Sequence, residues 1–159
     1  MTALIQRFQR LRKEEKGITL VELLAVIVII GVIAAIAVPL ITGLLDDTKE
    51  NARSATASQL LEAAKLRSIA TTDGEIKGTH TLDQLISGKY LQDGVTDPKS
   101  GKDLVKATTV VNLDNINSTT SPVVTLVVTD GETVNFTSAQ IKKGEPGTVK
   151  TTATSTPGS

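Results

Sequence analysis

The distribution of apolar residues along the 159-residue chain is very uneven. The range 1–17 is polar and basic, whereas the range 18–45 is almost wholly apolar. Glu22 is the one charged residue of that apolar range, and no further ionisable side chain occurs before Asp46. From Asp46 onward the composition is that of an ordinary water-soluble domain. The pattern therefore divides the chain into a basic leader, an apolar segment and a soluble part.

The apolar segment is long enough to cross a bilayer as a helix. At about 1.5 Å per residue it measures roughly 40 Å, whereas the hydrocarbon core of a bilayer is about 30 Å thick. Basic residues precede it and Asp46 and Asp47 follow it, so the positive-inside rule places the N-terminus in the cytoplasm. A secretory signal peptide is the rival interpretation, with a cleavage site at Ala35-Ile36-Ala37. Against it, the apolar run continues to Leu45 and passes directly into a helical pattern.

The range 46–70 has the pattern of an amphipathic helix with one face of small residues. Charged side chains, including that of Arg53, are expected to lie largely elsewhere on the helix. A Thr-Thr-Asp-Gly sequence follows, in which Gly74 can adopt the left-handed conformation that ends helices. The face consists of Thr48, Ala52, Ala55, Gln59, Ala63, Leu66 and Ala70. The simplest prediction is one long helix over about 18–70.

Three residues are expected to perturb this helix. Pro39 deletes a backbone hydrogen bond and clashes one turn back, which predicts a kink or local melting. Gly31 and Gly43 are further weak points, or points of close packing between helices.

The range 71–143 predicts a small globular head rich in β-strands. Thr81 is expected to cap a short helix over 82–86 that Gly88 closes. A strand is expected to place Thr109, Val111 and Leu113 on one face. The β-branched run 123–128 predicts a central strand.

An Asp130-Gly131 turn is expected to join that run to an alternating strand over 132–137, with Val134 and Phe136 facing inward. The predicted fold class is therefore α+β, with a long N-terminal helix packed against a small antiparallel sheet. Three strands are expected to cover the helix at Ala52, Ala63 and Leu66. The range 144–159, rich in threonine and proline, predicts a flexible tail.

Composition excludes several classes of function. The chain has no cysteine and one histidine, which rules out disulfides, thiolate sites and His-pair zinc motifs and leaves little room for a catalytic triad. Its formal net charge is zero and aromatic residues are 2% of the chain, so no nucleic-acid site is indicated. We therefore expect no enzymatic activity and no cofactor.

Glu22 requires an explanation, because a carboxylate inside a membrane segment is expensive and marks a functional site by default. One interpretation is an interfacial residue that extends to the lipid headgroups. The other needs a partner cation in the apolar environment.

The residues from Lys16 to Pro39 resemble the N-terminus of type IV pilins and related pseudopilins. They combine a basic leader ending in Gly17, a glutamate five residues beyond it, and an apolar run that contains Pro39. The resemblance covers roughly residues 16–41 and identifies a class III signal peptide with a prepilin methylation motif. It implies cleavage between Gly17 and Ile18 by a prepilin peptidase and N-methylation of Ile18, where most members of the family have phenylalanine.

The resemblance also implies a partner for Glu22. In pilin filaments this glutamate is thought to neutralise the N-terminal amine of a neighbouring subunit. Cleavage creates such a cation at Ile18, four residues from Glu22, and a subunit in the wrong register would bury an unpaired charge. Glu22 is therefore expected to determine the register of assembly.

The function implied is that of a structural subunit of a type IV pilus for motility, adhesion or DNA uptake. The alternatives are a pseudopilin of a type II secretion or competence machine, and a non-polymerising surface protein with an N-terminal anchor. The partners implied are further copies in a helical filament, the prepilin peptidase and methyltransferase, an inner-membrane assembly platform, minor pilins, and membrane lipid before assembly. The expected location is the bacterial cytoplasmic membrane and then the cell surface. The missing cysteines favour a Gram-positive source.

Two weaker sites remain. Asp93, Asp97 and Asp103 lie in one predicted loop and are candidate calcium ligands, although aspartates are common in solvated turns. His80 lies in a polar stretch and is expected to be an ordinary surface residue.

Overall fold

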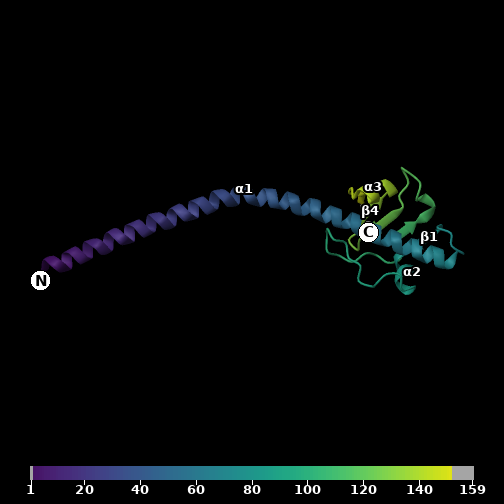
Figure 1. Ribbon diagram of the computed structural model, residues 1–159, viewed down its shortest axis with the longest axis horizontal. Coiled ribbons are helices and arrows are strands. Elements are labelled where there is room, and N and C mark those ends of the chain that lie inside the picture. Colours follow the sequence, from purple (N-terminus) through teal and green to yellow (C-terminus); the bar gives the residue numbers. More distant parts are fainter. Residues whose placement is uncertain (1, 152–159) are drawn as a thin grey trace, which may run out of the picture. The chain divides into compact units, whose positions relative to one another are not determined.

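The computed structural model describes the backbone of residues 2–151 and the side chains of residues 19–150. The chain divides into two compact units, Met1–Leu45 and Asp46–Ser159, and helix α1 runs through both (Figure 1). The elements in chain order are α1 (Thr2–Thr71), β1 (Thr79–Thr81), α2 (Leu82–Ser87), β2 (Val110–Asn112), the 3-10 helix η1 (Leu113–Asn115), β3 (Val124–Val127), β4 (Glu132–Phe136), α3 (Ser138–Lys143) and β5 (Thr148–Thr151).

The single helix α1 confirms the prediction of one long helix, which ends at Thr71 as expected. Gly74 follows with φ of +92°, the left-handed conformation that the sequence predicted. The helix begins at Thr2 rather than near Ile18, because the leader is itself rich in the strong helix formers Arg, Lys, Glu, Gln and Leu. The buried Ser68 connects the loop after α1 to the helix by hydrogen bonds. Its hydroxyl donates to the carbonyl oxygens of Glu75 (2.8 Å) and Lys77 (2.9 Å).

The second unit contains an antiparallel sheet of five strands in the order β1-β2-β3-β4-β5. The β-branched run forms the central strand β3, as predicted. The Asp130-Gly131 turn joins β3 to β4, and Gly131 has φ of +92°. Val134 and Phe136 are fully buried, which confirms the inward face of β4.

Two of the five strands were not predicted from the sequence. Strand β1 has three residues, too few for an alternating pattern to be recognised. Strand β5 lies within the range 144–159, which was predicted to be a flexible tail, and pairs with β4 between Thr148 and Thr151. Its side chains from Thr148 to Lys150 are exposed, so backbone pairing at the sheet edge, rather than apolar burial, holds it. Residues 152–159 of the predicted tail lie outside the described residues.

The predicted short helix is α2, and Thr81 caps it. The Thr81 side chain accepts from the backbone N–H of Gln84, whose side chain in turn accepts from the N–H of Thr81. Gly88 is the C-cap, but its φ is −77°, and the left-handed residue is Lys89. A Cβ on Gly88 would lie 2.8 Å from the Tyr90 ring, so close packing rather than a left-handed turn accounts for the glycine.

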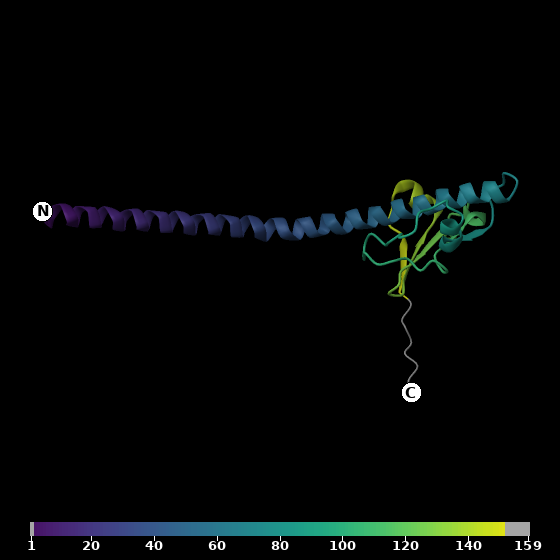
Figure 2. The same cartoon turned by 90° about the horizontal axis from the view of Figure 1, so that it is seen from below.

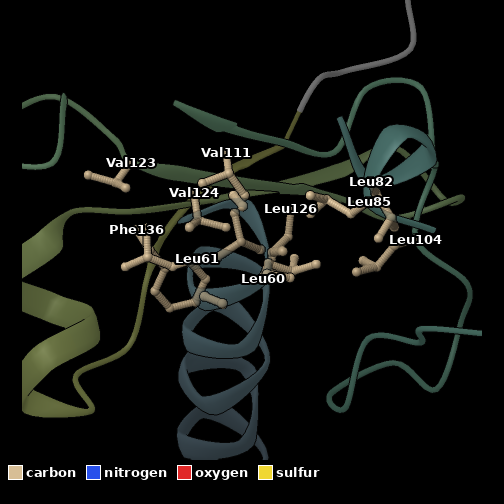
Figure 3. Packing of buried hydrophobic residues seen from close by; sticks show 14 of the residues in the cluster. Leu60, Leu61, Leu82, Leu85, Leu104, Val111, Val123, Val124, Leu126 and Phe136 are labelled. Carbon is tan, nitrogen blue, oxygen red and sulfur yellow. The ribbon is translucent and has the colours of Figure 1, made fainter. Parts of the chain in front are cut away.

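The apolar core lies between the sheet and the second half of α1. In Figure 2 this half of α1 runs along one side of the second unit. Leu60 and Leu61 of α1 point toward the strands that carry Val124, Leu126 and Phe136 (Figure 3). Leu82 and Leu85 of α2, with Leu104, close this core beside α1. The α+β fold with a long N-terminal helix against a small antiparallel sheet is thus confirmed.

The face of α1 that packs on the sheet is not the one predicted. The buried positions of α1 are Arg53, Ser54, Ala57, Leu60, Leu61, Ala63, Ala64 and Ser68. Of the predicted face only Ala63 is buried, Ala52 is half-buried, and Leu66 is 58% exposed. The prediction was wrong because it kept the charged Arg53 out of the core, whereas the fold buries it.

Replacing Gly147 by alanine should loosen the edge strand β5. A Cβ there would lie 2.7 Å from Cγ1 of Val134, 2.8 Å from Cζ of Phe136 and 2.9 Å from the carbonyl oxygen of Asn135, so the backbone has to shift. We expect a loss of about 1–3 kcal/mol, the usual range for overpacking. Urea unfolding of the full chain in detergent measures it. Val149→Ala, at a side chain that is 44% exposed, is the control, and an equal effect of both changes would contradict the explanation.

Candidate functional site

The first unit exposes a continuous apolar surface. Its large aliphatic side chains from Leu20 to Leu45 are 50–74% exposed. Within the described residues, α1 is the one helix long and apolar enough to cross a membrane. Such a surface requires cover by lipid or by other protein, because apolar area in water is unfavourable.

The predicted processing site lies in this unit. The backbone of Gly17 and Ile18 belongs to α1, and the side chain of Ile18 lies outside those that the structure describes. Glu22 is exposed on the helix one turn after Ile18, and no ion pair to Glu22 occurs among the described residues. The structure thus leaves the carboxylate accessible to a partner from outside the chain.

The helix is unbroken at Pro39 in the single chain. The hydroxyl of Thr42 donates to the carbonyl oxygens of Val38 and Pro39, at 3.0 Å each, one turn after the proline. A Cβ on Gly31 or on Gly43 would meet nothing within 4 Å, so no contact within the described chain requires a glycine at either position. The roles predicted for these three residues in an assembly stay predictions.

A buried ion-pair cluster holds α1 to the rest of the second unit. Arg53 and Asp97 are both fully buried. The Arg53 guanidinium donates from Nε to Asp97 Oδ1 at 2.5 Å and from Nη2 to Oδ2 at 2.6 Å, a two-pronged pair. Its Nη1 donates to Glu132 Oε1 at 2.9 Å. Arg53 therefore joins the helix to the loop of Asp97 and to the β3–β4 turn.

Arg53 and Asp97 each shift the pKa of the other toward its charged form. Burial alone would raise the pKa of Asp97, but the hydrogen bonds from Arg53 and Ser100 outweigh it and lower that pKa. Burial likewise opposes the charged form of Arg53, but the hydrogen bonds to Asp97 and Glu132 prevail and raise its pKa. Both groups are therefore charged at neutral pH, and each depends on the other.

The structure gives two of the three candidate calcium ligands ion-pair partners and leaves the third on the surface. Asp97 binds Arg53, Asp93 binds Lys106 Nζ at 2.7 Å, and Asp103 is exposed on the surface. No group of three or more His, Cys, Asp or Glu residues that could hold a metal occurs in the part of the chain that the structure describes. The geometry therefore does not support a calcium site at these residues.

His80 was expected at the surface, but it is only 5% exposed. Its Nδ1 lies 2.6 Å from Nη1 of Arg67 and its Nε2 lies 3.3 Å from the carbonyl oxygen of Lys77. A guanidinium can only donate, so Nδ1 accepts and the proton of the neutral ring is on Nε2. The expectation failed because His80 belongs to β1, which the sequence pattern did not reveal.

Comparison with known proteins identifies the N-terminal segment. Residues 12–38 match the family model described as the prokaryotic N-terminal methylation motif. This range contains Gly17, Ile18, Glu22 and Gly31, and it carries the class III signal peptide of type IV pilin-like proteins. It marks a substrate of the pilin or pseudopilin type and points to a structural protein. Comparisons with curated proteins and with solved structures found no match.

Proposed function

We propose that this chain is the prepilin of a type IV pilus, polymerised into a helical surface filament for motility, adhesion or DNA uptake. The observation that carries the proposal is the methylation motif over residues 12–38, joined to a helix whose apolar side chains are 50–74% exposed. A peptidase cleaves between Gly17 and Ile18, and Ile18 is N-methylated. The helix over 18–45 holds the subunit in the cytoplasmic membrane, N-terminus inside, until assembly covers it.

Assembly uses Glu22. The accessible carboxylate pairs with the Ile18 amine of a neighbouring subunit, and apolar area supplies the cohesion between helices. Assembly also needs an inner-membrane platform and minor pilins. The stretch from Gly31 to Gly43 is the softest part of the helix in the filament, because Pro39 has no N–H to donate to the carbonyl one turn back.

Two alternatives have distinct consequences. A pseudopilin of a secretion or competence machine would form short filaments, so the subunit would be scarce in sheared surface fractions. A surface protein with a simple membrane anchor would not polymerise at all. Electron microscopy of sheared filaments, with mass spectrometry of the subunit, separates the three.

Replacing Gly17 by leucine should block processing. The peptidase is expected to need a small residue before the cleaved bond, so a bulky side chain leaves the leader attached. We expect an uncleaved membrane protein, heavier by the mass of residues 1–17, and no surface filaments. Intact mass spectrometry and filament counts measure both.

The matched control is Ala3→Leu, which makes a similar change in the leader away from the junction and should leave cleavage normal. Assembled filaments whose subunits still contain residues 1–17 would contradict the proposal. Normal function of the uncleaved Gly17→Leu protein would favour the simple anchor.

A further inference from the structure

His80 attaches strand β1 to the end of helix α1. The side chain is buried, and its Nδ1 accepts a hydrogen bond from Nη1 of Arg67 at 2.6 Å. Its Nε2 donates to the carbonyl oxygen of Lys77 at 3.3 Å. Both ring nitrogens are therefore in use, and the arrangement requires the neutral ring, because a protonated imidazole has two donors and no acceptor.

The segment that this hydrogen bond attaches to α1 is short. Strand β1 has three residues, Thr79–Thr81, and lies at the edge of the sheet, where it pairs with β2. The loop before it is held to α1 by the Ser68 hydroxyl, which bonds to the backbone of Glu75 and Lys77. Short edge elements of this kind can open locally while the rest of a domain stays folded. The Arg67–His80 hydrogen bond therefore lies where a small loss of stability can open the structure.

A positive charge on His80 would have no compensating carboxylate. Among the described residues His80 forms no ion pair. The ionisable groups on the elements around it are Arg67 of α1, Asp73, Glu75 and Lys77 of the loop, Asp83 of α2 and Asp114 of η1. Glu75 pairs with Lys77, Asp114 accepts from the N–H of Gly78, and the other two aspartates are exposed. A protonated His80 would thus face the permanently charged guanidinium of Arg67.

We propose that His80 and Arg67 form a pH-sensitive latch, which is closed while the ring is neutral and which releases β1 and the loop before it from α1 when the ring is protonated. Protonation removes the acceptor for Arg67 and places two like charges 2.6 Å apart in a buried position. In the open form water solvates both groups, so the open form binds the proton more tightly than the closed form. The closed form is therefore stable above the pH range in which histidine titrates and is lost as the pH falls through that range.

Opening of the latch changes the edge of the sheet. In the closed form β2 is paired with β1 on one side and with β3 on the other, and Val111, opposite His80, is fully buried. Without β1, the backbone groups of β2 on that side are unpaired, and an unpaired edge is a template for another strand. Acid thus converts a closed edge of the second unit into one that is open to an extended chain. The latch does not depend on the pilus function proposed above.

Hydrogen–deuterium exchange of the full chain in detergent tests the latch. Exchange at about pH 7.5 and about pH 5 is converted to protection factors, which removes the pH dependence of the chemical exchange itself. An exposed histidine is half protonated at about pH 6.5, so complete exclusion of the proton from the closed form makes opening about 30-fold more frequent at the lower pH. We expect the protection of the peptide that contains β1 to fall by about 10–30-fold, and that of β3 and β4 by less than about twofold.

The matched control is His80→Gln. The glutamine oxygen can accept from Arg67, but the side chain takes up no proton, so the protection of β1 should change by less than about twofold between the two pH values. The Arg53–Asp97 pair keeps its charges at the lower pH, because the pKa of Asp97 is lowered. A loss of protection in His80→Gln equal to that in the unmodified chain would overturn the latch.

A second measurement needs no variant. The chain has one histidine, so the imidazole signal in an NMR spectrum belongs to His80. We expect the midpoint of the ring titration to coincide with the midpoint of the loss of protection in β1. Titration of the ring without any loss of protection in β1, or a simultaneous loss in β1, β3 and β4, would also overturn the latch.

Discussion

A Glu22→Gln strain should make a correctly processed subunit that stays in the membrane and forms no surface filaments. Glu22 is the one charged residue between Ile18 and Leu45, and the described residues provide no ion pair for it. If it neutralises the Ile18 amine of a neighbour, the glutamine variant leaves a buried ammonium without its counter-charge. Breaking a buried pair in this way costs about 3–5 kcal/mol. A filament repeats the contact at every subunit, so even part of that free energy should stop growth.

The measurement is an immunoblot for subunit size together with a count of surface filaments. Cleavage precedes assembly and does not need this carboxylate, so the subunit should have its mature size. Asp46→Asn, at the next carboxylate along α1, is the control and should leave filaments normal. If Glu22 only extends to lipid headgroups, the amide would be tolerated, and normal numbers of filaments in the Glu22→Gln strain would show that it is not a pairing residue.

Arg53→Met should lower the free energy of unfolding of the second unit by about 3–5 kcal/mol. The substitution keeps most of the apolar volume of the side chain but removes the guanidinium that binds both Asp97 oxygens. Asp97 is fully buried, so its carboxylate would be left charged without a partner or would have to take up a proton. The loop of Asp97 and the β3–β4 turn at Glu132 would both lose their attachment to α1.

Urea unfolding of the full chain in detergent measures this, with the single tyrosine, Tyr90, as the fluorescent probe of the second unit. Lys65→Met is the control, because its pair with Glu62 is partly exposed and should contribute about 1 kcal/mol or less. The double variant Arg53→Met with Asp97→Asn should be more stable than Arg53→Met alone, since no charge is then left buried at position 97. An Arg53→Met protein as stable as the Lys65→Met control would refute the role of the cluster.

The features predicted correctly from the sequence depend on neighbours along the chain. The apolar run of 18–45 and the helical pattern after it predicted α1, because helix formation is a matter of local periodicity. The β3–β4 hairpin followed from a two-residue turn signal and alternation, and the inward Val134 and Phe136 followed with it. The motif around Gly17 and Glu22 is likewise contiguous, and it matches the methylation motif without any knowledge of the fold.

The features that were missed depend on partners far apart in the chain. Periodicity shows that a helix has an apolar face, but the second half of α1 has two faces of small or apolar residues. From the sequence, the face of Leu66 was predicted to pack on the sheet. The fold places the sheet on the face of Leu60 and Ala64. That face contains Arg53, whose charge argued against burial, and only Asp97 and Glu132, brought in from the loop and the β3–β4 turn, make its burial favourable.

The same reason covers the two unpredicted strands and His80. Strand β5 buries none of its side chains from Thr148 to Lys150, so its conformation follows from backbone hydrogen bonds to β4, which leave no apolar pattern in the sequence. His80 is buried because β1 pairs with β2 and Arg67 supplies the donor for its ring. Helix α1, the β3–β4 hairpin and the processing motif can thus be derived from the sequence alone. The packed face of α1, the burial of Arg53 and the edge strands β1 and β5 arise only when segments that are distant in the sequence come into contact.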